Sequence, residues 1–270
     1  MKLSEAIEIL KSGGVPDAKR DAAEIFCRLG NIRKSDMLFS NPDCESEEVI
    51  RAIKARAERK PLQYIIGTVY FYNEEYEVDE SCLIPRADTE ILVDYAVKNI
   101  PSGARFADLC TGSGCVGISV LKNTDKTSAV LVDISGAALD TAKKNAERNG
   151  VSQRIEFLLK DVTECIPEGE FFAVLSNPPY VSDSAYEELE SEIYFEPKIA
   201  FVGGSDGADF YRKITPLYKN AISKDGFIAY EIGYDQAGLL RKIAKDENMT
   251  CEILKDYSGN DRVAILKRDN

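Results

Sequence analysis

The residues Asn177-Pro178-Pro179-Tyr180 form a short motif whose groups could hold a planar amino group. The Asn177 side chain offers a carbonyl acceptor and an amide donor. The two prolines have no N–H, so the backbone here presents only carbonyl oxygens. The Asn177 side-chain oxygen and the Pro178 carbonyl could each accept one hydrogen of an –NH₂ group, while Tyr180 stacks on its flat face. We expect this loop to align an amino nitrogen for attack on a methyl group.

A second candidate site is the glycine-rich run Gly112-Ser113-Gly114-Cys115-Val116-Gly117. Its G-x-G-x-x-G spacing lies between an expected strand and an expected helix, where it lets a ligand approach the backbone. Asp133 ends the next expected strand, and its carboxylate could accept hydrogen bonds from two ribose hydroxyls. A tight turn with a solvated Asp133 is the alternative. The pattern favours a dinucleotide or S-adenosylmethionine, and the Asn-Pro-Pro-Tyr loop selects the second.

The composition excludes several other chemistries. The chain of 270 residues contains no histidine, which rules out a histidine base, a Ser-His pair and a histidine-ligated metal. Its seven cysteines are scattered without a Cys-x-x-Cys pair, so we expect no metal site and a reducing, cytoplasmic location. The net charge of −12 disfavours duplex DNA as a partner. Charged residues interrupt the apolar ones at the start, so neither a signal peptide nor a membrane span is expected.

The strands and helices that must position these motifs lie after residue 104, where expected strands alternate with expected helices. The clearest helix covers 137–149, with Gly150 as its C-cap. Strands separated by helices favour a mainly parallel, doubly wound sheet. The short turn at 258–260 should instead pair the last two strands antiparallel. The expected strands are 106–109, 129–133, 155–159, 171–175, 226–232, 251–254 and 262–266.

The first part of the chain has a different pattern. Three amphipathic helical stretches occupy the first sixty residues, and so small a unit has little core of its own. Residues 64–66, 69–72, 75–78 and 82–84 have strand chemistry and predict a hairpin linker. We therefore expect a helical domain at 1–75, a linker at 76–104 and a cofactor-binding domain at 105–270. Because every cofactor motif follows residue 104, we assign substrate recognition to the first domain.

Several blocks of the sequence resemble the HemK/PrmC family of release-factor glutamine methyltransferases, from about residue 60 to 267. The Asn-Pro-Pro-Tyr motif alone is typical of enzymes that methylate adenine, cytosine or glutamine nitrogens. The order of the other blocks makes the resemblance specific to this family. Phe195 and Phe201 depart from it, standing where tyrosine and leucine are usual. The matching blocks are 61–67, 84–90, 108–114, 133–135, 177–180, 196–197, 203–207, 231–233 and 259–263.

The resemblance implies a seven-stranded, mostly parallel, Rossmann-like methyltransferase sheet with an antiparallel last strand, plus a small N-terminal helical domain. It implies S-adenosylmethionine as cofactor, S-adenosylhomocysteine as product, and the glutamine of the Gly-Gly-Gln motif in class 1 peptide chain release factors as substrate. Asn177 and Pro178 would hold the glutamine amide together with Pro179 and Tyr180. The residues implied at the cofactor are Cys110, Thr111, Gly112, Ser113, Gly114, Asp133 at the ribose, Asp161 and Val162 at the adenine, and Asn177.

Two other substrates stay open, as does a module that binds the cofactor without turnover. One is the N6 amino group of adenine in DNA, and the other is a glutamine of a ribosomal protein. A DNA methyltransferase needs a base-reading domain and a basic channel. The stretch 181–196 carries no Lys or Arg to form one, and its acidic residues are Asp183, Glu187, Glu188, Glu190, Glu192 and Glu196.

Overall fold

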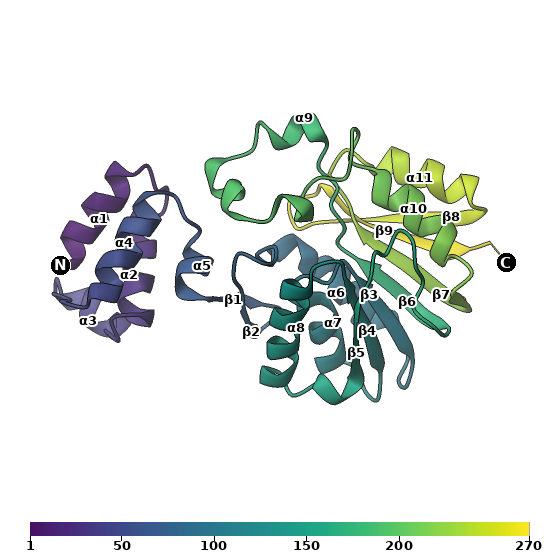
Figure 1. The fold of residues 1–270 in the computed structure, drawn as a ribbon, viewed down its shortest axis with the longest axis horizontal. Coiled ribbons are helices and arrows are strands. Elements are labelled where there is room, and N and C mark those ends of the chain that lie inside the picture. The colour runs from purple at the N-terminus through teal and green to yellow at the C-terminus, as the bar shows by residue number, and fades with distance from the viewer. Residues whose placement is uncertain (270) are drawn as a thin grey trace. The chain divides into compact units, whose positions relative to one another are not determined.

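A computed structural model describes residues 1–269, apart from the side chain of Leu38, as two compact units (Figure 1). The first unit comprises Met1–Thr68 and Glu190–Phe195. The second comprises Val69–Leu189 and Glu196–Asn270. No helix within residues 1–269 is both long enough and apolar enough to cross a membrane.

The first unit is helical. Helices α1, α2 and α4 pack on one another around Leu10, Ile25, Phe26 and Ile53, which are fully buried. The buried Arg56 lies 2.7 Å from Asp21 and 3.1 Å from Glu192, which attaches the segment Glu190–Phe195 to this unit. Within the described residues the helices are α1 (Leu3–Ser12), α2 (Ala18–Arg28), α3 (Lys34–Phe39), α4 (Glu47–Ala57), α5 (Leu62–Ile66) and η3 (Ser191–Phe195).

The expected strand at 64–66 is wrong, because these residues belong to helix α5. That helix packs on α2 and α4, and Gly67 ends it with a φ of 82°, in the left-handed region. The tertiary contacts override the strand propensity of the two isoleucines. Residues 82–84 also lie outside any strand. The hairpin itself is shorter than expected, with strands β1 (Thr68–Phe71) and β2 (Glu74–Glu77).

The second unit is built on a sheet in the order β5-β4-β3-β6-β7-β9-β8. Neighbouring strands from β5 to β7 are parallel, whereas β9 runs antiparallel to β7 and β8. The prediction of a seven-stranded, mostly parallel sheet with an antiparallel last strand is confirmed for the described residues. The strands are β3 (Arg105–Leu109), β4 (Ser128–Asp133), β5 (Ile155–Leu159), β6 (Phe171–Ser176), β7 (Ile222–Glu231), β8 (Met249–Lys255) and β9 (Asp261–Arg268).

Helices cover both faces of this sheet (Figure 1). Because side chains alternate along a strand, Phe106 faces one core and Ala107 the other. One face carries α6 (Glu90–Asn99), α7 (Cys115–Lys122) and α8 (Gly136–Arg148), and the other carries α10 (Asp209–Tyr218) and α11 (Ala237–Asp246). The short helices are η1 (Ala87–Thr89), η2 (Ser152–Arg154), α9 (Asp183–Tyr186) and η4 (Lys198–Ala200).

The parallel register brings the predicted site segments to one edge. Leu109, the last residue of β3, pairs with Val132 of β4 and with Ser176 of β6. The glycine-rich run follows β3, Asp133 ends β4 and Asn177 follows β6. All three therefore leave the sheet at its carboxyl edge, where ligands bind in open α/β sheets.

Candidate active site

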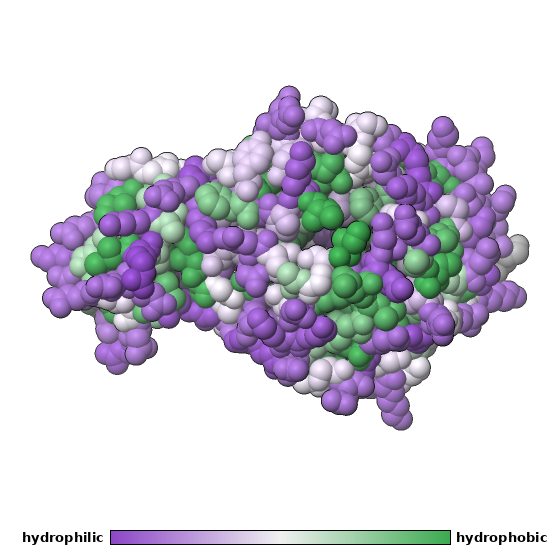
Figure 2. Space-filling model, viewed as in Figure 1, coloured by the Kyte–Doolittle hydropathy of each residue, from purple (hydrophilic) through white to green (hydrophobic). Residues whose placement is uncertain are grey.

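A cavity of about 290 Å³ opens at the carboxyl ends of β3, β4 and β6. Figure 2 shows hydrophobic side chains, in green, bordering a hollow on the visible face of the second unit. Gly114, Pro178 and Tyr180 are not among the described residues that line this cavity. The predicted site residues that do line it are Cys110, Thr111, Gly112, Ser113, Asp133, Asp161, Val162, Asn177 and Pro179.

Asp133 is held at the cavity by the backbone. Its Oδ2 accepts a hydrogen bond from the Gly112 N–H at 2.8 Å, and its Oδ1 accepts one from the Ser135 N–H at 2.9 Å. Burial raises the pKa of this carboxyl above its ordinary value, while the backbone donors act in the opposite direction. Each carboxylate oxygen still has a lone pair with which it could accept a ligand hydroxyl.

Gly114 serves the packing of the helix that follows. Its φ is 80°, and an added Cβ would lie 2.8 Å from the Ile118 Cδ1 and 3.1 Å from the Ala142 Cβ. A side chain here would therefore push α7 away from α8. This explains why the glycine belongs to the motif although it does not line the cavity.

Asp108 is a buried carboxyl bonded to the glycine-rich segment, and no role for its side chain followed from the sequence. Its Oδ2 accepts hydrogen bonds from the Thr111 hydroxyl at 2.6 Å and from the Gly117 N–H at 2.9 Å. Burial raises the pKa of Asp108 to about 7, although both hydrogen bonds lower it. The loop is thus anchored to a carboxyl group that can change its charge near neutral pH.

The Ser113 hydroxyl is the clearest sign that the cavity takes a polar ligand. The side chain is buried and lines the cavity, yet its Oγ has no hydrogen-bond partner within the described residues. The backbone of Ser113 is fixed, since its carbonyl accepts a hydrogen bond from the Asn145 side chain at 2.9 Å. A buried hydroxyl without a partner is unfavourable unless a ligand or water satisfies it.

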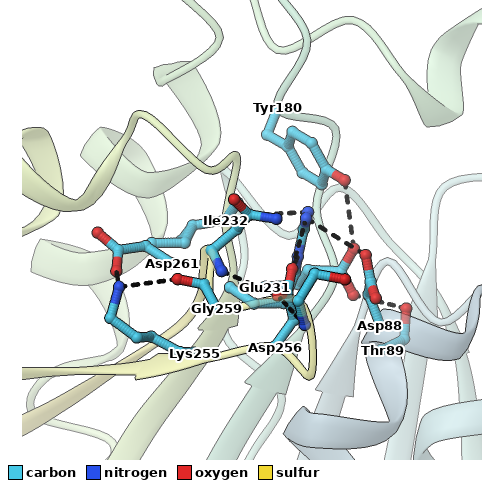
Figure 3. A network of polar contacts seen from close by, with 12 residues as sticks. Asp88, Thr89, Tyr180, Glu231, Ile232, Lys255, Asp256, Gly259 and Asp261 are labelled. Carbon is cyan, nitrogen blue, oxygen red and sulfur yellow. Dashed lines mark hydrogen bonds and ion pairs between the residues drawn. The ribbon is translucent and has the colours of Figure 1, made fainter.

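Asn177 belongs to a chain of hydrogen bonds that ends on a buried carboxyl, and Figure 3 shows the part of it formed by Thr89, Tyr180 and Glu231. Its side-chain Nδ2 donates to the Thr89 Oγ1 at 3.4 Å, and the Thr89 hydroxyl donates to the Glu231 Oε2 at 2.5 Å. The Tyr180 hydroxyl donates to the Glu231 Oε1 at 3.2 Å. The sequence assigned no role to Thr89 or Glu231. The only sequence signal was that both fall in blocks 84–90 and 231–233, which resemble the family.

Other cavity residues come from segments that the sequence left without a role. Leu83 and Pro85 precede α6, Ile199 follows the loop after β6, and Lys213 lies on α10. The buried Glu196 connects two of these segments. It accepts a hydrogen bond from the Ile84 N–H at 2.9 Å and forms an ion pair with Arg86. These two contacts hold the segment before α6 and the segment around η4 together, so that both line the cavity.

Two family models and several curated relatives match this chain. The Methyltransferase small domain matches residues 87–194, and the PrmC N-terminal domain matches residues 2–67. The release factor glutamine methyltransferase of Thermodesulfovibrio yellowstonii is 37% identical over 92% of this chain and 92% of that protein. The enzyme of the same name from Fusobacterium nucleatum subsp. nucleatum is 34% identical over 98% of this chain and 77% of that protein.

A solved structure shares the fold. The ribosomal protein L11 methylase from Lactobacillus delbrueckii subsp. bulgaricus has a TM-score of 0.54 and 18% identity, covering 72% of this chain and 84% of that one. At this identity the likeness concerns the fold alone. The sequence relatives, in contrast, match almost the whole chain and confirm the resemblance that its motifs indicated. This chain belongs to the release factor glutamine methyltransferase family.

Proposed function

We propose that this enzyme transfers a methyl group from S-adenosylmethionine to the side-chain amide of the glutamine in the Gly-Gly-Gln motif of class 1 peptide chain release factors. One observation carries the proposal: the glycine-rich loop, Asp133 and Asn177 all line one cavity. The names of the relatives support a release factor glutamine as the target. A cytoplasmic location fits the free cysteines of the described chain.

The cofactor would be held by residues of the glycine-rich loop and of the two segments that follow β4 and β5. Asp133 would accept the ribose hydroxyls, and Ser113 would pair its unsatisfied hydroxyl with a polar group of the ligand. Asp161 accepts hydrogen bonds from the Thr163 N–H at 2.8 Å and from its hydroxyl at 2.7 Å, which fixes the turn. That turn would hold Asp161 and Val162 beside the adenine.

The residues of the Asn-Pro-Pro-Tyr loop would align the substrate. S-adenosylmethionine supplies an activated methyl group when bound, but an amide nitrogen is a poor nucleophile because its lone pair is delocalised. Asn177 and the Pro178 carbonyl would accept the two amide hydrogens and hold the nitrogen in line with the methyl group. This proximity is worth several kcal/mol. Both acceptors also favour the positive charge that develops on the nitrogen, and water can take the proton afterwards.

Asp133→Ala is expected to weaken S-adenosylmethionine binding by about 1–3 kcal/mol, the cost of losing a charged hydrogen-bond partner. Isothermal titration calorimetry measures the change. Asp140→Ala is the matched control, since it removes an exposed carboxylate of α8 that pairs with Lys143. Equal affinity in the Asp133 variant and the wild type would remove Asp133 from the site. Tighter binding of NAD by the wild type would contradict the cofactor itself.

The helical unit would recognise the protein substrate, since the described residues that line the cavity all belong to the second unit. Deletion of residues 1–68 should leave cofactor affinity near that of the full chain. It should lower kcat/KM for intact release factor by about tenfold or more, the effect of losing about 1.4 kcal/mol of binding. Calorimetry and initial rates separate the two properties. Full turnover by the shortened protein would show that the helical unit is not needed for recognition.

The proposed reaction is tested by incubating the enzyme with purified release factor and isotope-labelled S-adenosylmethionine. Mass spectrometry of the tryptic peptides should place one labelled methyl group on the glutamine of the Gly-Gly-Gln motif. A ribosomal protein mixture and duplex DNA serve as competing substrates in parallel reactions. A methyl group found on either of these, with none on the release factor, would contradict the proposal.

A further inference from the structure

We propose that Glu231 and Thr89 fix the orientation of the Asn177 side-chain amide, so that its carbonyl oxygen, and not its –NH₂ group, faces the substrate amide. This inference rests on the proposed function. Glu231 does not line the cavity among the described residues, so it would act through Thr89 and Tyr180 as a positioning residue.

The Glu231 carboxylate determines the direction of the hydrogen bonds that orient Asn177. Glu231 is the last residue of β7, is 2% exposed, and accepts a hydrogen bond on each carboxylate oxygen. An ionised carboxylate can only accept, so the single proton of the Thr89 hydroxyl must point at Glu231. The same holds for the Tyr180 hydroxyl, and burial raises the pKa of Tyr180 far enough to keep that proton in place. Figure 3 shows the Tyr180 hydroxyl directed toward Glu231.

The Thr89 hydroxyl in turn determines how the Asn177 side-chain amide is oriented. Because the Thr89 hydroxyl donates its proton to Glu231, its oxygen can only accept a hydrogen bond from its second neighbour. Asn177 approaches this oxygen at 3.4 Å, and only the –NH₂ end of its amide can donate there. The reversed amide would place a carbonyl oxygen against a lone pair. The –NH₂ end therefore stays on Thr89, which leaves the Asn177 carbonyl oxygen available to accept a substrate N–H.

Burial and the polar neighbours of Glu231 act in opposite directions on its charge. Burial raises the pKa of Glu231 above its ordinary value, whereas the hydrogen bond from Thr89, the charge of Arg262 and the hydrogen bond from Tyr180 lower it. Asp88 raises it again, but that carboxylate lies 3.2 Å from the Arg262 guanidinium. Arg262 is itself held 3.1 Å from Asp256. The half-buried guanidinium of Arg262 therefore acts on the Glu231 carboxylate and favours its charged form.

The contributing residues come from separate parts of the fold. Thr89 lies at the start of α6, Asn177 and Tyr180 follow β6, and Glu231 ends the neighbouring strand β7. Tyr211 of α10 additionally donates to the Glu231 backbone carbonyl at 2.9 Å, which fixes the end of the strand. Because β6 and β7 are adjacent, a side chain at the end of β7 can reach the loop that follows β6.

The first test compares Thr89→Val with Thr89→Ser. Valine keeps the shape but removes both hydrogen bonds, so kcat on release factor should fall about tenfold or more, as expected for a misaligned acceptor. KM and cofactor affinity should change by no more than about twofold, the pattern of an interaction needed in the transition state. Serine keeps the hydroxyl and should restore most of kcat. Thr127→Val is the matched control, since it removes a buried hydroxyl that bonds to Thr124, before β4.

A change on the carboxylate gives an independent check. Glu231→Gln keeps the size of the side chain, but its –NH₂ group can donate to Thr89. The Thr89 hydroxyl is then free to donate to Asn177 and reverse its amide, so kcat should fall although every partner is still present. Wild-type kcat in Thr89→Val or in Glu231→Gln would overturn the inference. Equal losses of kcat and thermal stability in Thr89→Val and Thr89→Ser would also overturn it.

The final measurement does not depend on turnover. In ¹⁵N-labelled protein, the Asn177 side-chain amide signal can be assigned by its disappearance in Asn177→Asp. Thr89→Val should shift this signal and accelerate its exchange with water, while Thr89→Ser and Thr127→Val should not. An unchanged Asn177 signal in Thr89→Val would overturn the inference. If the wild type fails to methylate release factor, the proposed function fails, whereas this signal still tests the orientation of Asn177.

Discussion

Asn177→Ala should lower kcat by roughly a hundredfold or more, because a substrate nitrogen without its acceptor loses the geometry needed for attack. Cofactor affinity and thermal stability should stay near wild type. Asn177 is partly exposed at the cavity, and within residues 1–269 its one side-chain hydrogen bond is the long contact to Thr89. Single-turnover rates at saturating release factor measure the chemical step. Asn99→Ala is the matched control, since its exposed amide donates to the Tyr95 carbonyl of the preceding helical turn.

Asn177→Asp separates the two functions of the amide. Aspartate keeps an acceptor for the substrate but replaces the donor to Thr89 with a second carboxylate oxygen. The new charge also lies on the same hydrogen-bond chain as Glu231. The Asp variant is therefore expected to fail as severely as the Ala variant. A wild-type rate in the Ala variant would mean that the loop is only a turn, and the proposed mechanism would be wrong.

The sheet could be predicted because its strands are distinctive. Residues 129–133 and 171–175 are short apolar runs between helical patterns, and both are buried central strands in the structure. Residues 64–66 have the same local chemistry but form a helix. Three residues are too few for periodicity to distinguish the two states, and packing on α2 and α4 decides between them. At β7, the polar residues 223–225 concealed the start of a strand that begins at Ile222.

Some residues of the candidate site could likewise be predicted from the sequence, and others could not. Asp133 and Asn177 could be placed because each directly follows or ends a strand, and parallel strands end at one edge of a sheet. The contact between Thr89, Glu231 and Tyr180 depends on β7 lying beside β6 and on where α6 begins. The order of strands in a sheet is a property of the whole fold. No local pattern around residue 89 or 231 indicates that those side chains meet.

Asp108 should make the stability of the cofactor-free enzyme depend on pH in a direction opposite to that of most carboxyls. Its pKa is raised from 3.8 to about 7, with burial as the largest cause. Between these values the folded state binds a proton that the unfolded state has already lost. The stability contributed by this group is therefore fully present below about pH 4 and is lost as the pH rises through 7.

The comparison of wild type with Asp108→Asn isolates this effect, since the variant keeps every other ionisable group. Each pKa unit corresponds to about 1.4 kcal/mol, so wild type should lose about 2–3 kcal/mol relative to the variant between pH 5 and pH 8. Urea unfolding without cofactor at several pH values measures the difference. A constant difference across this range would contradict the raised pKa. A difference that moves the other way would mean that the hydrogen bonds from Thr111 and Gly117 outweigh burial and hold Asp108 ionised.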